Sequence, residues 1–287
     1  APAPGADFLD AWRAVMDAAP SSLVWTPRHG GHWVATRGRE IELIYRDHEA
    51  FSSRVVLVPR AWGEAFQIKP TTLDPPVHTP YRRIINASLS PSDIERAHGT
   101  IREVAIGLVE GVQDLGRCDF IRDIAAKLPI AIFLHLAGLP QEDAHSLPRY
   151  AEPILDESGA ATEARIMDRF ADYLRPHCRA RMAAPEDDFL SRIVRGGVGQ
   201  TVLDEDEAVE MATTMMTGGL DTITSTLGML MAFLARNPTH RDQLAAEPSK
   251  VGAAVVELLR RHPIMTKARL CVAQRELDGV TIAPGDM

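Results

Sequence analysis

The feature that most constrains this chain is a long apolar stretch from Met211 to Leu234. Apolar residues recur near helical period from 204 to 236, so the sequence predicts one long buried helix. The stretch contains Thr-Gly-Gly-Leu-Asp-Thr at residues 217–222. Each of the two glycines costs a helix interior about 1 kcal/mol relative to alanine, so the pair requires a packing or functional reason.

Six small or polar residues fall on one side of the predicted helix, at the 3.6-residue period. This polar stripe consists of Thr214, Thr217, Gly218, Asp221, Thr222 and Ser225. Periodicity leaves three interpretations open: close packing against another backbone, a membrane span, or the wall of a ligand site. A membrane span is disfavoured because a central aspartate costs about 2.5–3.5 kcal/mol on insertion and no second span is present.

As the wall of a ligand site, the stripe leads to a structural expectation. We expect the helix to widen or kink at Gly218 and Gly219, freeing carbonyl groups that can hold water. We expect Asp221 to be a buried acid beside the Thr222 hydroxyl. An acid, a hydroxyl and water together could conduct protons.

The remaining sequence predicts a mainly α-helical chain with small sheets at its two ends. Helical periodicity marks residues 8–19, 101–112, 123–137, 163–182 and 251–261. Two β-prone runs, 22–26 and 32–36, flank a Pro/Gly turn and predict a hairpin. A second hairpin is predicted in 276–285, where Asp-Gly forms the turn.

Charge and cysteine content exclude some functions. The 287 residues carry a formal net charge of −8, which argues against a general binder of nucleic acid or anionic membranes. The cysteines Cys118, Cys178 and Cys271 are far apart, which fits a reducing cytoplasm better than a disulfide framework. The first residues lack the basic and apolar regions of a signal peptide, so we expect none.

Two further segments carry charged groups with meaningful spacing. Residues 72–83 predict a helix start with Asp74 as its N-cap and three prolines in its first turn. His78 and Arg82 then share one face and suit an anionic ligand, although a solvated basic face is the simpler interpretation. Glu257 and Arg260, three residues apart on a helix, have the spacing of a common surface pair.

Taken in order, these motifs resemble the cytochromes P-450, the haem-thiolate monooxygenases, and among them the bacterial camphor-hydroxylase-like group. The resemblance covers essentially the whole chain. It is carried by Gly218-Gly-Leu-Asp-Thr222, by Glu257-Leu-Leu-Arg260, by residues 73–82, and by residues 23–26, 30–38 and 136–140. It implies a single cytochrome P-450 domain over residues 1–287: a large helical domain with a long central helix and small β-sheets.

The resemblance also implies roles for individual residues around haem b. Asp221 and Thr222 would be catalytic, bringing protons from solvent to the oxygen chemistry, and Gly218 would lie over the haem. His78, Arg82 and Arg269 would hold the haem propionates. Glu257 and Arg260 would form a structural ion pair. The substrate pocket would be lined by Leu57, Phe66, Thr71, Thr214, Thr217 and Met265.

The chain departs from the family pattern at two points. Camphor hydroxylases have a tyrosine in the place of Phe66, and its hydroxyl bonds a substrate ketone. A phenylalanine cannot do so, which favours another terpenoid or a norisoprenoid over camphor. The family also needs a Phe-x-x-Gly-x-x-x-Cys loop for the haem ligand, and no such loop occurs before Met287. We therefore expect the axial cysteine beyond Met287, in a C-terminal part outside this sequence, and a few further residues before Ala1.

The resemblance implies a cytoplasmic monooxygenase that inserts one oxygen atom into a C–H bond of a small apolar substrate. An iron–sulfur ferredoxin would supply the electrons, and neither nucleic acid nor a membrane would be a partner. One alternative is a non-catalytic helical protein that binds small molecules without a thiolate ligand. Another is a helical enzyme that uses Asp221 with metal, as terpene cyclases use aspartates; it would need an aspartate-rich cluster, and 204–207 reads better as an acidic helix start.

Overall fold

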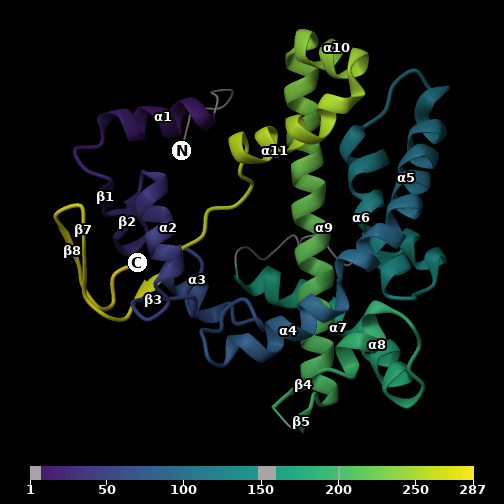
Figure 1. Ribbon diagram of the computed structural model, residues 1–287, viewed down its shortest axis with the longest axis horizontal. Coiled ribbons are helices and arrows are strands. Elements are labelled where there is room, and N and C mark those ends of the chain that lie inside the picture. Colours follow the sequence, from purple (N-terminus) through teal and green to yellow (C-terminus); the bar gives the residue numbers. More distant parts are fainter. Residues whose placement is uncertain (1–7, 148–159, 200) are drawn as a thin grey trace. The chain divides into compact units, whose positions relative to one another are not determined.

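The computed structural model describes residues 8–147, 160–199 and 201–287. The chain divides into two compact units, drawn together in Figure 1. Unit 1 combines residues 1–79 with 265–287, and unit 2 spans residues 80–264. The architecture is mainly α-helical with small two-stranded sheets, which confirms the predicted fold class. Whether the two units count as a single domain stays a prediction.

Unit 1 begins with helix α1 (Phe8–Ala18) and the hairpin β1 (Leu23–Thr26) and β2 (His32–Ala35). The strands are antiparallel, with Leu23 opposite Ala35, as the sequence predicted. A short 3₁₀ turn, η1 (Arg28–Gly30), joins them, and Gly30 and Gly31 adopt positive φ angles that suit glycine. Helices α2 (Gly38–Arg46) and α3 (Arg60–Ala65) follow.

The C-terminal segment of the chain completes unit 1. Strand β3 (Phe51–Ser52) pairs antiparallel with β6 (Leu270–Cys271), and β7 (Arg275–Leu277) forms a hairpin with β8 (Val280–Ile282). The second hairpin turns at the predicted Asp-Gly pair, whose residues both have positive φ. The core brings together Leu23, Ala50, Phe51, Cys271 and Ile282, so both segments contribute to it.

The described residues of unit 2 are helical apart from one small hairpin and the connecting segments. Its elements are α4 (His78–Ser88, which begins at the end of unit 1), α5 (Pro91–Gln113), the π-helical turn η2 (Ile121–Ala125), α6 (Lys127–Leu136), η3 (Gln141–His145), α7 (Ala160–Ala183), α8 (Phe189–Val194), β4 (Gly197–Val198), β5 (Thr201–Val202), α9 (Glu205–Arg236), α10 (Pro238–Ala246), η5 (Pro248–Lys250) and α11 (Val251–Arg261). The predicted helix 251–261 therefore has the observed bounds. Small sheets at the two ends of the chain are confirmed, and the β4–β5 hairpin in mid-chain is a further one that the sequence did not predict.

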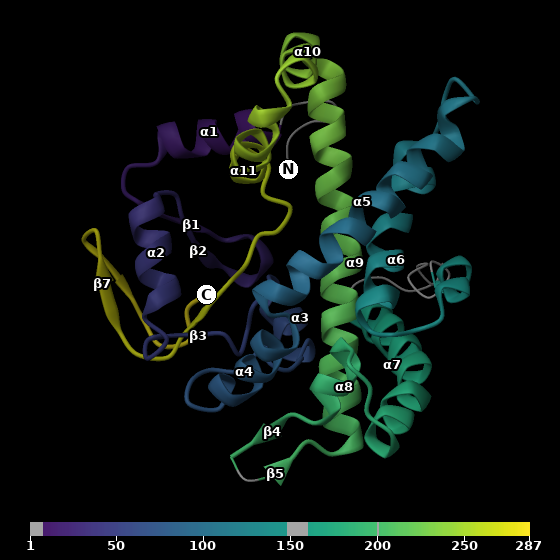
Figure 2. The same cartoon turned by 45° about the vertical axis from the view of Figure 1, so that its right-hand side comes forward.

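Helix α9 is the central element of unit 2 and packs against α6, α7, α8 and η2. In Figure 2 it appears as the long green helix, with α6 and α7 beside it. Asp204 caps its N-terminus by accepting a hydrogen bond from the Glu207 amide at 2.8 Å. Arg179 donates to Glu205 at 2.7 Å, which ties the start of α9 to α7. The predicted bounds of this helix are thus confirmed.

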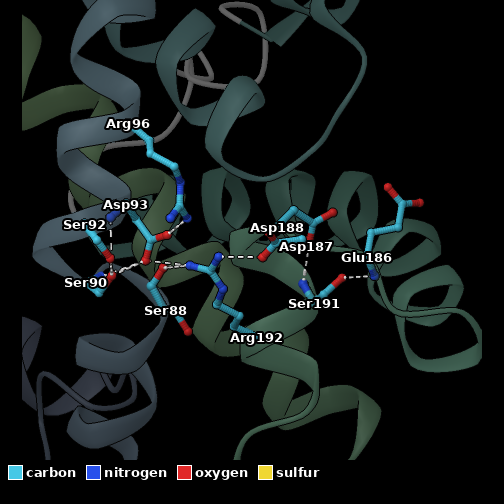
Figure 3. Close-up of polar contacts among 10 residues, drawn as sticks. All are labelled: Ser88, Ser90, Ser92, Asp93, Arg96, Glu186, Asp187, Asp188, Ser191 and Arg192. Carbon is cyan, nitrogen blue, oxygen red and sulfur yellow. Dashed lines mark hydrogen bonds and ion pairs between the residues drawn. The ribbon is translucent and has the colours of Figure 1, made fainter.

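A polar cluster ties the start of α5 to α8 (Figure 3). Ser90 and Asp93 form a capping box at the N-terminus of α5. The nearly buried Asp93 carboxylate also accepts from Arg192 of α8 at 2.6 Å. These hydrogen bonds, the one from Arg192 foremost, hold the pKa of Asp93 well below its ordinary value. The capping box starts α5 ten residues before the predicted helix 101–112.

Two local predictions were wrong for physical reasons. Asp74 does not cap a helix, because its carboxylate accepts from the Ser53 amide at 2.7 Å and from the Ser52 hydroxyl in unit 1. Helix α4 therefore begins only at His78, whose amide bonds the Asp74 backbone carbonyl at 2.9 Å. The predicted helix 123–137 is divided at Ala126, where a π turn meets α6.

Candidate functional site

The polar stripe of α9 runs from a buried region into an open one. Thr214 is only 9% exposed, and Thr217 is half-buried. Gly218 and Asp221 are exposed, and Thr222 is half-buried. The stripe therefore has one end in the packed interior of unit 2 and its remainder on an accessible helix face.

Gly218 of the stripe and its neighbour Gly219 face open space. A Cβ atom added at Gly218 or at Gly219 would meet no heavy atom within 4 Å. Gly228, nearly three turns after Gly218 along α9, differs because a Cβ there would collide with Ile121 of η2. Close packing of the described residues therefore explains Gly228 and does not explain Gly218 or Gly219. This finding weighs against the packing interpretation of the stripe.

Two expectations about this helix were wrong in this structure. Helix α9 continues as regular α-helix through Gly218 and Gly219, without widening or kinking. Kinks arise from proline, π-bulges or inserted groups, and glycine permits a kink without enforcing one. Asp221 is exposed and is not the buried acid that we expected. Whether these residues conduct protons remains a prediction.

The hydroxyl groups of the three stripe threonines are bonded to the helix itself. Thr222 Oγ1 donates to the Gly218 carbonyl at 2.6 Å, which holds the Thr222 side chain in a defined rotamer. Thr217 Oγ1 donates to the Thr213 carbonyl at 2.8 Å. Thr214 Oγ1 donates to the Glu210 carbonyl at 2.9 Å. These bonds fix the direction in which each hydroxyl proton points.

His78 and Arg82 lie four residues apart on α4, which confirms their predicted shared face. His78 is half-buried and Arg82 is exposed. Among the described residues, the Arg82 guanidinium has neither an ion-pair partner nor a hydrogen-bond partner. Its charge is therefore available to an anionic ligand.

Arg269 belongs to unit 1 and stands directly before β6, at the predicted strand entrance. Its guanidinium lies over the Tyr45 ring at 4.3 Å from the centroid and donates to the Ala268 carbonyl at 2.8 Å. It makes no ion pair with any carboxylate in the described parts of the chain. Sequence reasoning missed Tyr45, because no local pattern links residues 45 and 269.

The residues predicted to line the substrate pocket are divided between the units. Thr214 and Thr217 belong to α9 of unit 2; Leu57, Phe66, Thr71 and Met265 belong to unit 1. Leu57 and Phe66 are half-buried, and Met265 is 48% exposed. The backbone of Leu57 lies against Gly63 of α3, so closely that a Cβ atom added at Gly63 would collide with it. The structure thus places each residue within its own unit, and their common role stays a prediction.

Glu257 and Arg260 form the predicted ion pair on α11. Two nitrogens of the Arg260 guanidinium, Nε and Nη2, each donate to a different carboxylate oxygen of Glu257 at 2.7 Å, which makes the pair bidentate. The hydrogen bond raises the pKa of Arg260 and lowers that of Glu257. Both side chains are largely exposed, so the pair by itself contributes little stability.

Comparisons with known proteins place this chain in a family. A sequence model described as Cytochrome P450 matches residues 164–257. "Probable cytochrome P450 127A1" of Sinorhizobium fredii is 30% identical over 291 residues, covering 100% of this chain and 70% of that relative. "Erythromycin C-12 hydroxylase" of Saccharopolyspora erythraea is 30% identical over 279 residues, covering 92% and 68%.

Solved structures agree with these sequence relatives. CYP101J2 has a TM-score of 0.88 at 36% identity, covering 99% of this chain and 72% of that one. The chain belongs to the cytochrome P450 family. It is accordingly a monooxygenase, an oxidoreductase whose cofactor is haem b. CYP101C1 is also similar, with a TM-score of 0.87 and 34% identity over 98% of this chain.

The residues of the chain fit haem b in part. Haem carries two carboxylates, and Arg82 and Arg269 are cations without a carboxylate partner among the described residues. Beside Gly218, the space that a side chain would occupy is open, so a flat ring could approach the helix there. When bound, haem supplies the oxygen chemistry itself. Each of these residues is therefore suited, within its own unit, to contact a haem, and their common role stays a prediction.

None of the three cysteines of this chain lies in the loop that the family pattern requires for the axial thiolate. Burial raises the pKa of Cys178 to about 12 and also raises the pKa of Cys271. Cys118 is exposed, in the connection between α5 and η2, and lacks the Phe-x-x-Gly-x-x-x-Cys context. The location of the ligand beyond Met287 stays a prediction.

Proposed function

We propose that this P450 hydroxylates a small apolar substrate of terpenoid or norisoprenoid type, with electrons from an iron–sulfur ferredoxin in the cytoplasm. The open face at Gly218 carries the proposal. It leaves room above a regular helix for a cofactor and a substrate, and Asp221 and Thr222 lie within one turn of it. His78, Arg82 and Arg269 hold the haem propionates, and the axial cysteine follows Met287.

The proposed substrate class rests on the pocket residues. Leu57, Phe66 and Met265 offer apolar surface, and the phenyl ring of Phe66 has no hydroxyl with which to anchor a ketone. Apolar walls with few polar groups orient a ligand mainly by its shape. Relatives with names such as erythromycin C-12 hydroxylase indicate that the family accepts varied substrates, so a panel of ligands is needed.

Thr222 has the most direct test. In the full-length holoenzyme with ferredoxin and reductase, Thr222→Ala should leave electron consumption largely intact, because the residue is not part of the electron path. The product formed per electron should fall about tenfold or more, since proton delivery by a positioned group contributes about 10²–10⁴-fold to such steps. Product yield, NADH consumption and hydrogen peroxide release together measure this coupling.

Thr224→Ala is the matched control. Thr224 also donates to a helix carbonyl, that of Leu220 at 2.8 Å, but it faces η2 and lies outside the polar stripe. It should retain normal coupling. Normal coupling in Thr222→Ala would remove the relay role from Thr222.

A carbon-monoxide difference spectrum of the reduced full-length protein tests the class as a whole. A Soret band at the position typical of thiolate ligation is expected. A protein that folds, binds terpenoids and shows no Soret absorbance would instead be the non-catalytic binding protein considered above.

A further inference from the structure

The inference concerns which hydrogen-bonding groups α9 can offer to a ligand. A backbone carbonyl can only accept, so each stripe threonine bonded to one has already used its single hydroxyl proton. This applies to Thr214, Thr217 and Thr222, at oxygen–oxygen distances of 2.6–2.9 Å. Each hydroxyl keeps only lone pairs for a further partner. The stripe threonines are therefore acceptors.

The other members of the stripe add no strong donor. Gly218 has no side chain, and an ionised Asp221 carboxylate only accepts. Ser225, at the far end of the stripe, has no hydrogen-bond partner among the described residues and keeps its proton. Near Thr214 and Thr217, the side chains of the stripe are hence uniformly hydrogen-bond acceptors.

We propose that Thr217, assisted by Thr214, selects substrates that carry a hydroxyl group over the corresponding ketones. This rests on the proposed function, in which α9 forms one wall of the substrate pocket. Thr217 as a residue is half-buried, at the border between the packed and the open part of the stripe. A substrate alcohol donates to the Thr217 oxygen without disturbing the helix. The preferred ligand is accordingly a small apolar alcohol.

A ketone meets the opposite situation. To donate to a ketone, Thr217 must rotate and break its bond to the Thr213 carbonyl. A typical intramolecular hydrogen bond corresponds to a factor of about three to ten in an equilibrium constant. A ketone therefore either loses about this factor in affinity or binds without a hydrogen bond to Thr217.

Three ligands with one skeleton test the proposal. Bornane, camphor and borneol differ only in carrying no polar group, a ketone or a hydroxyl. Their binding to the full-length holoenzyme is measured by calorimetry and by the spin-state shift of the haem. Thr217→Val keeps the shape and removes the oxygen. It should weaken borneol about three- to tenfold and change bornane and camphor by less than about twofold.

Two controls locate the effect. Thr217→Ser keeps the hydroxyl and should preserve the borneol-to-camphor affinity ratio. Thr224→Val removes a back-bonded hydroxyl outside the stripe and should also preserve it. An unchanged ratio in both Thr217→Val and Thr214→Val, or a selective loss of camphor, overturns the alcohol selection.

Thr217→Phe separates this inference from the proposed wall. The added ring should weaken all three ligands if α9 lines the pocket. If all three bind normally to that variant, the wall assignment fails, and the inference fails with it. If Thr217→Phe blocks binding while Thr217→Val keeps the ratio, the wall stands and only the alcohol selection is wrong.

Discussion

The two halves of α9 have similar apolar sequences and very different surroundings. Between Ala208 and Met216 most side chains are buried, whereas beyond Leu220 none of the residues up to Arg236 is buried. By composition the whole helix is even apolar enough to cross a membrane. Burial therefore depends on the neighbouring elements, and an apolar helix face without such neighbours is available to a ligand or to another segment.

Methionine substitutions should show the largest difference between the halves. Met211 and Met216 are 0% exposed, and Met231 is 41% exposed. Met211→Ala and Met216→Ala should each lower the free energy of unfolding by about 2–5 kcal/mol, because each leaves a cavity. Met231→Ala should lower it by about 0.5–1 kcal/mol. Urea unfolding followed by circular dichroism measures the three changes.

This set tests the comparison directly, since the same atoms are removed at each position. Equal destabilisation at Met216 and Met231 would mean that the second half of α9 is also packed in solution. The distinction between the halves would then be lost.

Glycine substitutions should show an effect of intermediate size. Gly218→Ala should raise the free energy of unfolding by about 1 kcal/mol, because alanine favours the helix and its Cβ meets open space. Gly228→Ala should raise the free energy of unfolding by less, because the added Cβ displaces the Ile121 side chain. Thermal unfolding of the chain without haem measures both changes. A loss of stability in Gly218→Ala would show that another group already occupies the face.

The contribution of α9 to the pH dependence of the unfolding free energy should come from the N-terminal half of the helix alone. It should be the smallest of the three effects. Hydrogen bonds from Arg179 and then Arg175 lower the pKa of Glu205 below its ordinary value of 4.5. A lowered pKa contributes stability above pH 4.5 and loses it as the pH falls below that value. Between Asp221 and Arg236 there is no ionisable side chain to act similarly.

Glu205→Gln should therefore reduce the fall in unfolding free energy between about pH 5 and pH 3. Chemical unfolding at several pH values checks this. A curve parallel to that of the unaltered protein would show that the contact with Arg179 does not persist in solution.

The sequence predicted the elements whose signals are local. Asp204 marks the start of α9, and the Asp278–Gly279 pair marks a hairpin turn, because capping and turn chemistry act within a few residues. The capping box of Ser90 and Asp93 was an equally local signal for α5 that was missed. Asp74 has the same local pattern, but distant serines bind its carboxylate.

Contacts over long sequence distances could not be predicted in the same way. The pairing of β3 with β6 and the stacking of Arg269 on Tyr45 join residues that no periodicity connects. For the site, the stripe of α9 was predictable from helical spacing alone. The exposure of Asp221 was not, since it depends on which elements cover that face.

The composition of unit 1 also has a consequence for how the chain is made. Ser22 bonds Asp278, Trp33 bonds Asp286 and Asp47 pairs with Arg275, so the first segment is completed by residues translated after unit 2. Ribosomes add about 5–20 residues per second, so the 185 residues of unit 2 take roughly 10–40 s to emerge. During that interval the exposed edge of β3 and its apolar neighbours await their partners, which makes this stage the one at which a chaperone would be of most use.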